Sequence, residues 1–422
     1  MQASLKLLGK RRFLPLFITQ LLGAFNDNLF KTAMVLFATY AIYSDPKMES
    51  NFNALSTGLF ILPFFLLSAL SGQLADTTDK ARIIRFVKGA EIGIMAVGAT
   101  GLLIQSIPVM LVAVLAMGVH STFFGPIKYA ILPQHLSEDE VLGGTGLVEA
   151  GTYLAILAGT VVAGWISPQA TAITVVVVAI IGFISGNAVP PAPRLGPPLV
   201  IDHNVLRSSW TLISGTMHIR RLFLAICSIS FFWMIGSVLV IIFPPLVKNV
   251  FDASKEVASL FLAIFSVGVA VGSIIVNRLL GGHVSARYAP ASVLAMGAFV
   301  IYLYFVAQGW EVLPGGSFYD IAAFTAHDRA WQVLSALFGI AVTGGMFVVP
   351  LYAFLMTTVE KDQTARTIAA NNVVNSGAMV IGALAIMGAT AAGLSVTGAL
   401  LLVAGMCLLS AWIAWILHKA CD

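Results

Sequence analysis

Several charged residues lie inside stretches that otherwise have the composition of membrane-spanning helices. A charge near the middle of a bilayer costs at least ~2.5 kcal/mol on insertion scales, so such residues usually face a polar cavity and serve a function there. In "GAFNDNLFK" (23–31), an aspartate and a lysine stand four positions apart, on one face of a helix, where they can pair with each other. The intramembrane charged residues of this kind are Asp27, Lys31, Glu91, Lys128 and Glu149.

Two of these residues, Lys128 and Glu149, are predicted near the same end of two consecutive spans. They can form a structural ion pair, or they can bind a ligand, with Lys128 holding a phosphate and Glu149 an ammonium group. Glu91 stands three positions after Lys88, and this spacing favours a structural ion pair between them. Asn26 and Asn28 flank Asp27 and cannot both share its face, so at least one of them should bond a neighbouring helix.

These charges all belong to the first half of the chain. The predicted spans of the second half have no Asp, Glu or Lys away from their ends, and their polar groups are amides such as Asn372 and Asn375. A cavity with charged residues on one side and mostly apolar residues on the other matches an amphiphilic ligand. Its polar head would contact the first half, and its hydrocarbon tail would contact the second. The alternative is a carrier whose proton coupling is confined to one half.

The elements that position these residues follow from composition. The chain has 422 residues, of which 59% are hydrophobic and 10% are charged. A soluble protein carries about 25% charged residues, so the chain is predicted to be an all-α protein that crosses a membrane many times. The three cysteines and seven histidines form no disulfide framework or metal-ligand motif. The small positive net charge of +4 indicates a basic membrane face and not a nucleic-acid partner.

Windows of about 20 mostly apolar residues predict twelve spans. They are 13–43, 54–75, 82–105, 107–130, 140–165, 169–190, 219–248, 256–279, 287–308, 331–357, 364–390 and 393–417. Lysines and arginines gather in one set of loops, with only Lys47, Lys248, Lys255 and Arg329 in the opposite set. The positive-inside rule then places both termini in the cytoplasm.

The spans divide into two related halves. We predict a six-helix bundle over 1–190, a Pro-rich cytoplasmic linker over 191–218 and a second six-helix bundle over 219–422. "RRFLPLF" (11–17) resembles "RRLFLAI" (220–226), and "PIKYAIL" (126–132) resembles "PLYAFL" (350–355). Placing Pro126 on Pro350, with one deletion, aligns Glu149 with Asn372 and Gly159 with Gly382. Parallel six-span repeats are the architecture of the major facilitator superfamily.

The loop between spans 2 and 3, "GQLADTTDKAR", resembles that superfamily's glycine–aspartate motif. Thr77 and Asp79 depart from it, since they replace the usual basic residue and glycine. Glycine permits close helix approach, and an aspartate can pair or cap across an interface that opens and closes. The candidate gate residues are Gly72, Asp76, Lys80 and Arg82. The alternative is a solvated charged loop.

Four stretches together resemble the bacterial lysophospholipid transporter family and the transporter portion of its acyltransferase fusions. They are "LGAFNDNLFK", "GQLADTTDKAR", "FFGPIKYAILP" and "GLVEAGTYLAILAGTVVAG". The resemblance implies a monomeric flippase of the bacterial inner membrane, which moves lysophospholipids from the outer to the inner leaflet for re-acylation by a cytoplasmic acyltransferase. It also implies that substrate is bound by Asp27, Asn28, Lys128 and Glu149. The residue pattern adds Lys31, Asn372 and Asn375 as candidate substrate-binding residues.

Three other functions are alternatives to lysophospholipid transport. A facilitator-type exporter of small amphipathic drugs could use the same cavity. An intramembrane enzyme would need a nucleophile–base set or a metal site, and the sequence has neither HExxH nor a Ser-His-acid set. A receptor or scaffold that transports nothing is the third. No GxxxxGK[ST] motif occurs, so neither ATP drive nor a cofactor is expected.

Overall fold

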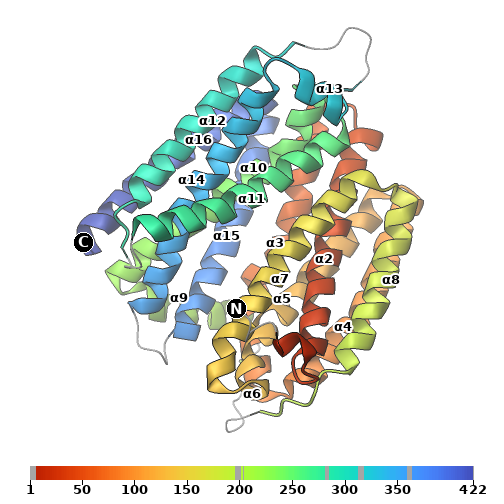
Figure 1. Ribbon diagram of the computed structural model, residues 1–422, viewed down its shortest axis with the longest axis vertical. Coiled ribbons are helices and arrows are strands. Elements are labelled where there is room, and N and C mark those ends of the chain that lie inside the picture. The colour runs from red at the N-terminus through yellow and green to blue at the C-terminus, as the bar shows by residue number, and fades with distance from the viewer. Residues whose placement is uncertain are drawn as a thin grey trace. The chain divides into compact units, whose positions relative to one another are not determined.

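The computed structural model describes residues 6–194, 201–202, 204–280, 285–311, 318–358 and 364–421. A few side chains inside these helices, among them those of Asp76 and Glu149, are outside the described set. In the described ranges, twelve α-helices have 20 residues or more, one for each predicted span (Figure 1). This confirms the predicted all-α fold.

Ten of the long helices are apolar enough to cross a membrane by length and composition. The other two are α2 (Leu14–Phe37) and α7 (Glu138–Trp165). In α2, the polar side chains between residues 20 and 31 account for this, namely Gln20, Asn26, Asp27, Asn28 and Lys31. In α7, the part that the structure describes contains a shorter apolar segment, Leu154–Trp165.

Contacts between Cα atoms group the chain into two compact units. The first contains Met1–Phe37 and Leu66–Ser208, and the second contains Ala38–Phe65 and Ser209–Asp422. The segment 38–65 therefore groups with the later helices. The predicted domain boundaries at 190 and 219 remain a prediction.

In the first unit, α2 packs against both α7 and α8, and α4 packs against both α5 and α8. The unit also contains the end of α3 and two short helices. The bounds are η1 Lys6–Gly9, α2 Leu14–Phe37, α3 Pro46–Thr77, α4 Lys80–Leu103, α5 Ile107–Ala130, α6 Leu132–His135, α7 Glu138–Trp165 and α8 Pro168–Asn187. The next helix, α9 (Val205–Met217), begins in this unit and ends in the second.

The second unit repeats this packing. Here α10 packs against α15 and α16, and α12 packs against α14 and α16. Its remaining elements include the π-helical turn η2 that follows α2. The bounds are η2 Ala38–Ile42, α10 Arg220–Asn249, α11 Lys255–Leu279, α12 Ala289–Gln308, α13 Ile321–Ala326, α14 Ala330–Thr357, α15 Thr364–Ala391 and α16 Val396–Cys421.

Two aligned glycines fix the register of this repeat. A Cβ on Gly159 of α7 would lie 2.6 Å from the Phe25 oxygen and 3.0 Å from the Leu29 nitrogen of α2. A Cβ on Gly382 of α15 would lie 2.8 Å from Met234 Cγ and 3.3 Å from Val238 Cγ2 of α10. Met234 and Val238 follow Phe25 and Leu29 by 209 positions, the shift that also aligns Arg220 with Arg11. The predicted alignment of Gly159 with Gly382 therefore agrees with the packing.

Substitution of Gly159 should separate α2 from α7. Because the nearest atoms belong to the α2 backbone, the Gly159→Ala variant is expected to lose about 1–3 kcal/mol of stability. Gly72→Ala is the matched control, since a Cβ there would meet no atom within 4 Å. Thermal unfolding followed by size-exclusion chromatography measures both variants. Equal melting temperatures for the two would contradict the close packing.

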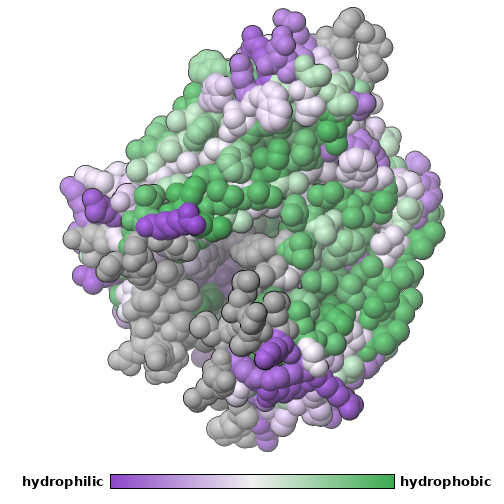
Figure 2. Space-filling model, in the orientation of Figure 1, coloured by the Kyte–Doolittle hydropathy of each residue, from purple (hydrophilic) through white to green (hydrophobic). Residues whose placement is uncertain are grey.

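The exposed surfaces of the long helices are apolar. In α8, Ile173 is 68% exposed and Ile184 is 63% exposed, and in α16, Leu408 is 64% exposed. Figure 2 shows hydrophobic side chains along the sides of the helices and hydrophilic ones near their ends. Such large apolar surfaces suit contact with lipid, and the chain is a multi-pass membrane protein.

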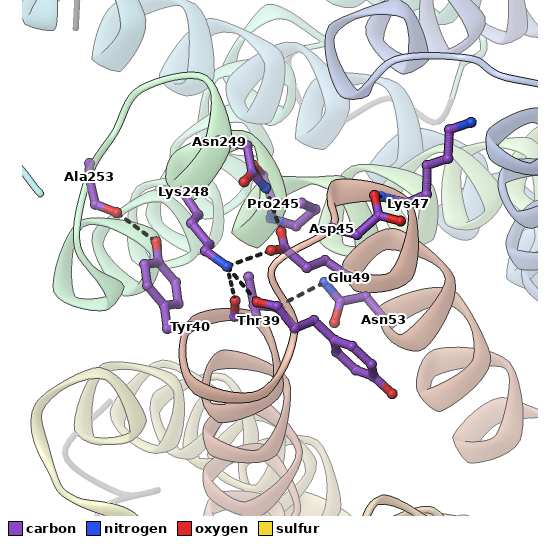
Figure 3. A network of polar contacts seen from close by, with 11 residues as sticks. Thr39, Tyr40, Asp45, Lys47, Glu49, Asn53, Pro245, Lys248, Asn249 and Ala253 are labelled. Carbon is purple, nitrogen blue, oxygen red and sulfur yellow. Dashed lines mark hydrogen bonds and ion pairs between the residues drawn. The ribbon is translucent and has the colours of Figure 1, made fainter. Parts of the chain in front are cut away.

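At the end of α10, a buried polar network attaches the chain segment that follows α2 (Figure 3). Lys248 Nζ donates to the Thr39 oxygen at 2.5 Å, to the Tyr43 oxygen at 2.8 Å and to Glu49 Oε1 at 2.5 Å. Asn249 donates to the other Glu49 oxygen. The lysine thus satisfies carbonyls at the π-helical turn η2, whose geometry differs from that of an α-helix, and this explains why 38–65 groups with α10.

Glu49 has no exposed surface, and Lys248 is only 12% exposed at its side chain. The Glu49→Ala variant leaves a buried ammonium group without its carboxylate, which should cost about 3–5 kcal/mol. Lys47→Ala is the control, because Lys47 is exposed on the same helix. Chemical unfolding in detergent should separate the two variants. If Glu49→Ala matched the control, the network would have no structural importance.

Candidate functional site

A fully buried ion pair lies in α4 of the first unit. Lys88 and Glu91 form an ion pair, and their side chains are 0% and 1% exposed. The predicted structural pairing is confirmed. A buried charge needs such a partner, because its desolvation is otherwise uncompensated.

Two further helices complete this network. Asn26 Nδ2 of α2 donates to Glu91 Oε1 at 3.1 Å and to the Val175 oxygen of α8 at 3.0 Å. His120 Nε2 of α5 lies 3.3 Å from Glu91 Oε2. As predicted, one of the asparagines beside Asp27 bonds neighbouring helices. We assign this cluster, which we call the buried network, a structural function, because its Lys, Glu, Asn and His side chains are all buried.

Glycines make room for the lysine of the buried network. A Cβ on Gly182 of α8 would lie 3.0 Å from Lys88 Cε, and a Cβ on Gly186 would lie 3.3 Å from Lys88 Cγ. A Cβ on Gly23 of α2 would lie 3.2 Å from Lys88 Nζ. The aliphatic part of the lysine therefore passes between glycine faces of two helices, a detail that the sequence did not predict.

Asp27 belongs to a different environment from its neighbour Asn26. Its Oδ2 accepts a hydrogen bond from Ser121 Oγ of α5, and its Oδ1 is buried and has no hydrogen-bond partner among the described residues. Lys31 is one turn further along α2 and interacts electrostatically with Asp27. Asn28 Nδ2 donates to the Ala24 oxygen of its own helix at 2.8 Å. The side chains of Asp27, Asn28, Lys31 and Ser121 are half-buried, so they can contact water or a polar ligand.

Lys128 takes part in a second polar connection between helices. Its Nζ donates to Thr152 Oγ1 of α7 at 3.3 Å, and Thr152 Oγ1 donates to Gln20 Oε1 of α2 at 2.8 Å. Gln20 Nε2 is buried, and no side chain or carbonyl in the described part of the structure accepts a hydrogen bond from it. The predicted alternative of an ion pair between Lys128 and Glu149 involves the Glu149 side chain, which lies outside the described residues. Gln20, Ser121 and Thr152 were missed by sequence reasoning.

Both connections link α2 to α5, and we call them rungs. The first joins Asp27 directly to Ser121, and the second joins Gln20 to Lys128 through Thr152 of α7. Asp27 and Gln20 are seven residues apart on α2, and Ser121 and Lys128 are seven residues apart on α5. Seven residues are two turns, so the rungs are about 10 Å apart along the helices and share one face. This spacing is the signal by which Gln20 and Ser121 could have been found. We call Gln20, Asp27, Ser121, Lys128 and Thr152 the two-rung site.

The corresponding positions of the second unit are neutral. Asn375 accepts from Ser230 Oγ at 2.7 Å and donates to Tyr352 OH at 3.3 Å. Trp233 Nε1 donates to the same phenol oxygen at 2.7 Å, and Trp233 is 38% exposed. Asn372, the other predicted amide, is exposed.

The repeat relates the two polar clusters. The alignment of Pro126 with Pro350 places Lys128 on Tyr352, and the alignment of Glu149 with Asn372 places Thr152 on Asn375. A contact between Lys128 and Thr152 in the first unit thus becomes a contact between Tyr352 and Asn375 in the second. This one contact therefore recurs in both units, once with an ammonium group and once with a phenol.

The candidate gate residues lie around the junction of α3 and α4, and their function as a gate remains a prediction. Asp79 caps α4 by accepting from the Ala81 nitrogen at 2.9 Å, and it also accepts from the Ala192 nitrogen at 3.1 Å. Lys80 is buried and Arg82 is exposed. The close helix approach expected at Gly72 is not found, because a Cβ there would meet nothing within 4 Å. The Asp76 side chain is outside the described residues.

Comparison with known proteins decides the family. The family model of the Major Facilitator Superfamily matches residues 16–383, which include both units' polar clusters. The chain belongs to the major facilitator superfamily. This membership confirms the predicted fold. It also confirms the prediction that the protein is a transporter and not an enzyme. Among solved structures, an auto-inhibited POT family peptide transporter shares the fold, with a TM-score of 0.71 and 12% identity over 98% of each chain.

Curated relatives in this superfamily share more of the sequence. The chain is 26% identical to the Lysophospholipid transporter LplT of Escherichia fergusonii over 376 residues, which are 86% of this chain and 85% of that protein. It is 27% identical to the LplT of Escherichia coli O1:K1 over 387 residues, with the same coverage. The predicted resemblance to this branch of the superfamily is confirmed. The two-rung site lies on α2, α5 and α7 of this chain.

Proposed function

We propose that this protein moves lysophospholipids across the bacterial inner membrane, from the outer to the inner leaflet, by alternating access. The similarity to transporters named for lysophospholipids, over most of both chains, supports the substrate class. The observation that carries the proposal is the contrast between the half-buried ionic groups of the two-rung site and the neutral cluster of the second unit.

A lysophospholipid has one acyl chain and a head group that contains a phosphate. Lys128, held by Thr152, supplies a point charge for the phosphate. Asp27 and Glu149 supply carboxylates for an ammonium group such as that of ethanolamine. Lys31 and Asn28 extend the polar face of α2 around Asp27.

The second unit suits the less polar parts of the same molecule. Tyr352, Asn375 and Asn372 can meet the glycerol and ester oxygens, and Trp233 presents an aromatic surface to a hydrocarbon chain.

The loop with Gly72, Asp76, Lys80 and Arg82 would then control access from one side. With the basic loops in the cytoplasm, both termini are cytoplasmic, and the product is delivered to a cytoplasmic acyltransferase.

Transport can be measured with purified protein in liposomes. Radiolabelled lysophosphatidylethanolamine is added from outside, and albumin then extracts whatever remains in the outer leaflet. The protein should raise the fraction protected from albumin well above that in protein-free liposomes. A cationic amphipathic dye, tested in the same vesicles, distinguishes a drug exporter. Movement of the dye without movement of the lysophospholipid would overturn the proposal.

A further inference from the structure

Helix α9 (Val205–Met217) has an apolar face that the rest of the protein does not cover. Trp210 is 72% exposed and Leu206 is 67% exposed. Ile213 and Met217 follow at the next two turns and are half-buried. The spacing of four, three and four residues places these side chains along one stripe of the helix.

The most buried side chains of the same helix are polar. Ser209 is 6% exposed and Thr216 is 5% exposed, and both lie on the side that meets the protein. A helix at a water-exposed surface shows the opposite arrangement, with its apolar stripe toward the protein. The exposed stripe of α9 therefore calls for an apolar environment outside the chain.

The place of α9 in the sequence indicates which environment this is. Only His218 and Ile219 separate it from α10, which is long and apolar enough to cross a membrane. At the start of α10, Ile219 is 38% exposed and Phe223 is 44% exposed, so the apolar surface continues onto the spanning helix. Two residues span about 7 Å at most, which keeps the end of α9 at the level of the membrane surface.

Charge adds a second observation. Arg207 is on the flank of the apolar stripe, and Arg220 and Arg221 follow directly after α9. All three are exposed, and none forms an ion pair with another described residue. An amphipathic helix with Trp and Leu on one face and basic residues beside it binds the boundary between head groups and acyl chains, and the basic residues favour anionic lipid.

We propose that α9 lies in the head-group layer of the membrane, with the stripe of Leu206, Trp210, Ile213 and Met217 among the acyl chains and with Arg207, Arg220 and Arg221 on anionic phospholipid head groups. This inference concerns attachment of the segment between α8 and α10 to the bilayer. It does not depend on which molecule the protein transports.

A fluorescent probe of depth tests the proposal. In a background with Cys227→Ser, Cys407→Ala and Cys421→Ser, single variants Trp210→Cys and Thr211→Cys carry an environment-sensitive NBD label in vesicles of phosphatidylcholine and phosphatidylglycerol. Thr211 is exposed and lies away from the apolar stripe. Spin-labelled lipid should quench the label at 210 at least threefold more than at 211, and iodide should show the reverse order. Equal quenching at the two positions would overturn the proposal.

Two further measurements complete the test. Neutralising the arginines (Arg207→Gln, Arg220→Gln, Arg221→Gln) should reduce the lipid quenching at 210 in anionic vesicles and leave it unchanged in vesicles of pure phosphatidylcholine. If the cysteine-substituted background does not fold, brominated lipid can be used with the native tryptophans. The Trp210→Phe variant should then lose part of the quenchable emission. Quenching that is identical with and without Trp210 would contradict membrane contact.

Discussion

The Glu91→Leu variant is expected to lose about 3–5 kcal/mol of stability, because it leaves the Lys88 ammonium group buried without its carboxylate. It also removes the acceptor of Asn26 and the partner of His120. The substitution therefore removes interactions with three side chains at a position that has almost no access to water. Guanidinium or thermal unfolding in detergent, followed by tryptophan fluorescence, measures the loss.

A second variant separates charge from packing. The Lys88→Met/Glu91→Leu double variant removes both charges and retains two long apolar side chains, so it should recover most of the lost stability. Arg82→Gln on the same helix is the control, since Arg82 is exposed and its loss should cost less than about 0.5 kcal/mol. A double variant as unstable as Glu91→Leu would show that Lys88 and Glu91 are needed for another reason than mutual compensation.

The second large effect is expected on transport. Lys128→Met keeps the long side chain but removes the charge proposed to bind the phosphate, and it should reduce lysophospholipid transport at least tenfold. The loss of one charge-assisted hydrogen bond, worth about 1.5–3 kcal/mol, accounts for this size. The rate of albumin-protected uptake in liposomes measures it, at matched protein content.

Two further substitutions locate the effect. Thr152→Val removes the hydroxyl group that contacts Lys128 and should reduce transport less, by about threefold, because the charge remains. Lys47→Met is exposed and distant in sequence from the two-rung site, and it should transport at the rate of the unmodified protein. Normal transport by Lys128→Met would remove this lysine from the proposed head-group site.

The fold was largely predictable from the sequence, because membrane helices are defined by length and apolarity. All twelve predicted spans have a helix, although α3 begins at Pro46 and not near residue 54. The early start arises because Glu49 is buried against Lys248 in the network at the end of α10, which offsets its poor fit to a hydropathy window. Helix α9 has 13 residues, which is shorter than a membrane span, and it lies within the segment predicted as a Pro-rich linker.

The candidate site was predictable only in part. The type and spacing of Lys88, Glu91 and Asp27 identified groups that must pair or serve a function, and the first two do pair. Uncharged partners such as Gln20, Ser121 and Thr152 were missed, because a hydroxyl or an amide costs little in a helix and has no distinctive composition. Their positions depend on which helices pack together, and the sequence specifies that only through the repeat.

Equilibrium binding in nanodiscs tests the central claim most directly, that the ionic groups of the first unit recognise the head group. Radiolabelled lysophosphatidylethanolamine is displaced by unlabelled lysophosphatidylethanolamine or by monoacylglycerol of the same chain length, which lacks the phosphate. The unmodified protein and Tyr352→Phe should both prefer the lysophospholipid at least tenfold, and Lys128→Met should lose this preference. Retention of the preference in Lys128→Met, with its loss in Tyr352→Phe, would contradict the account.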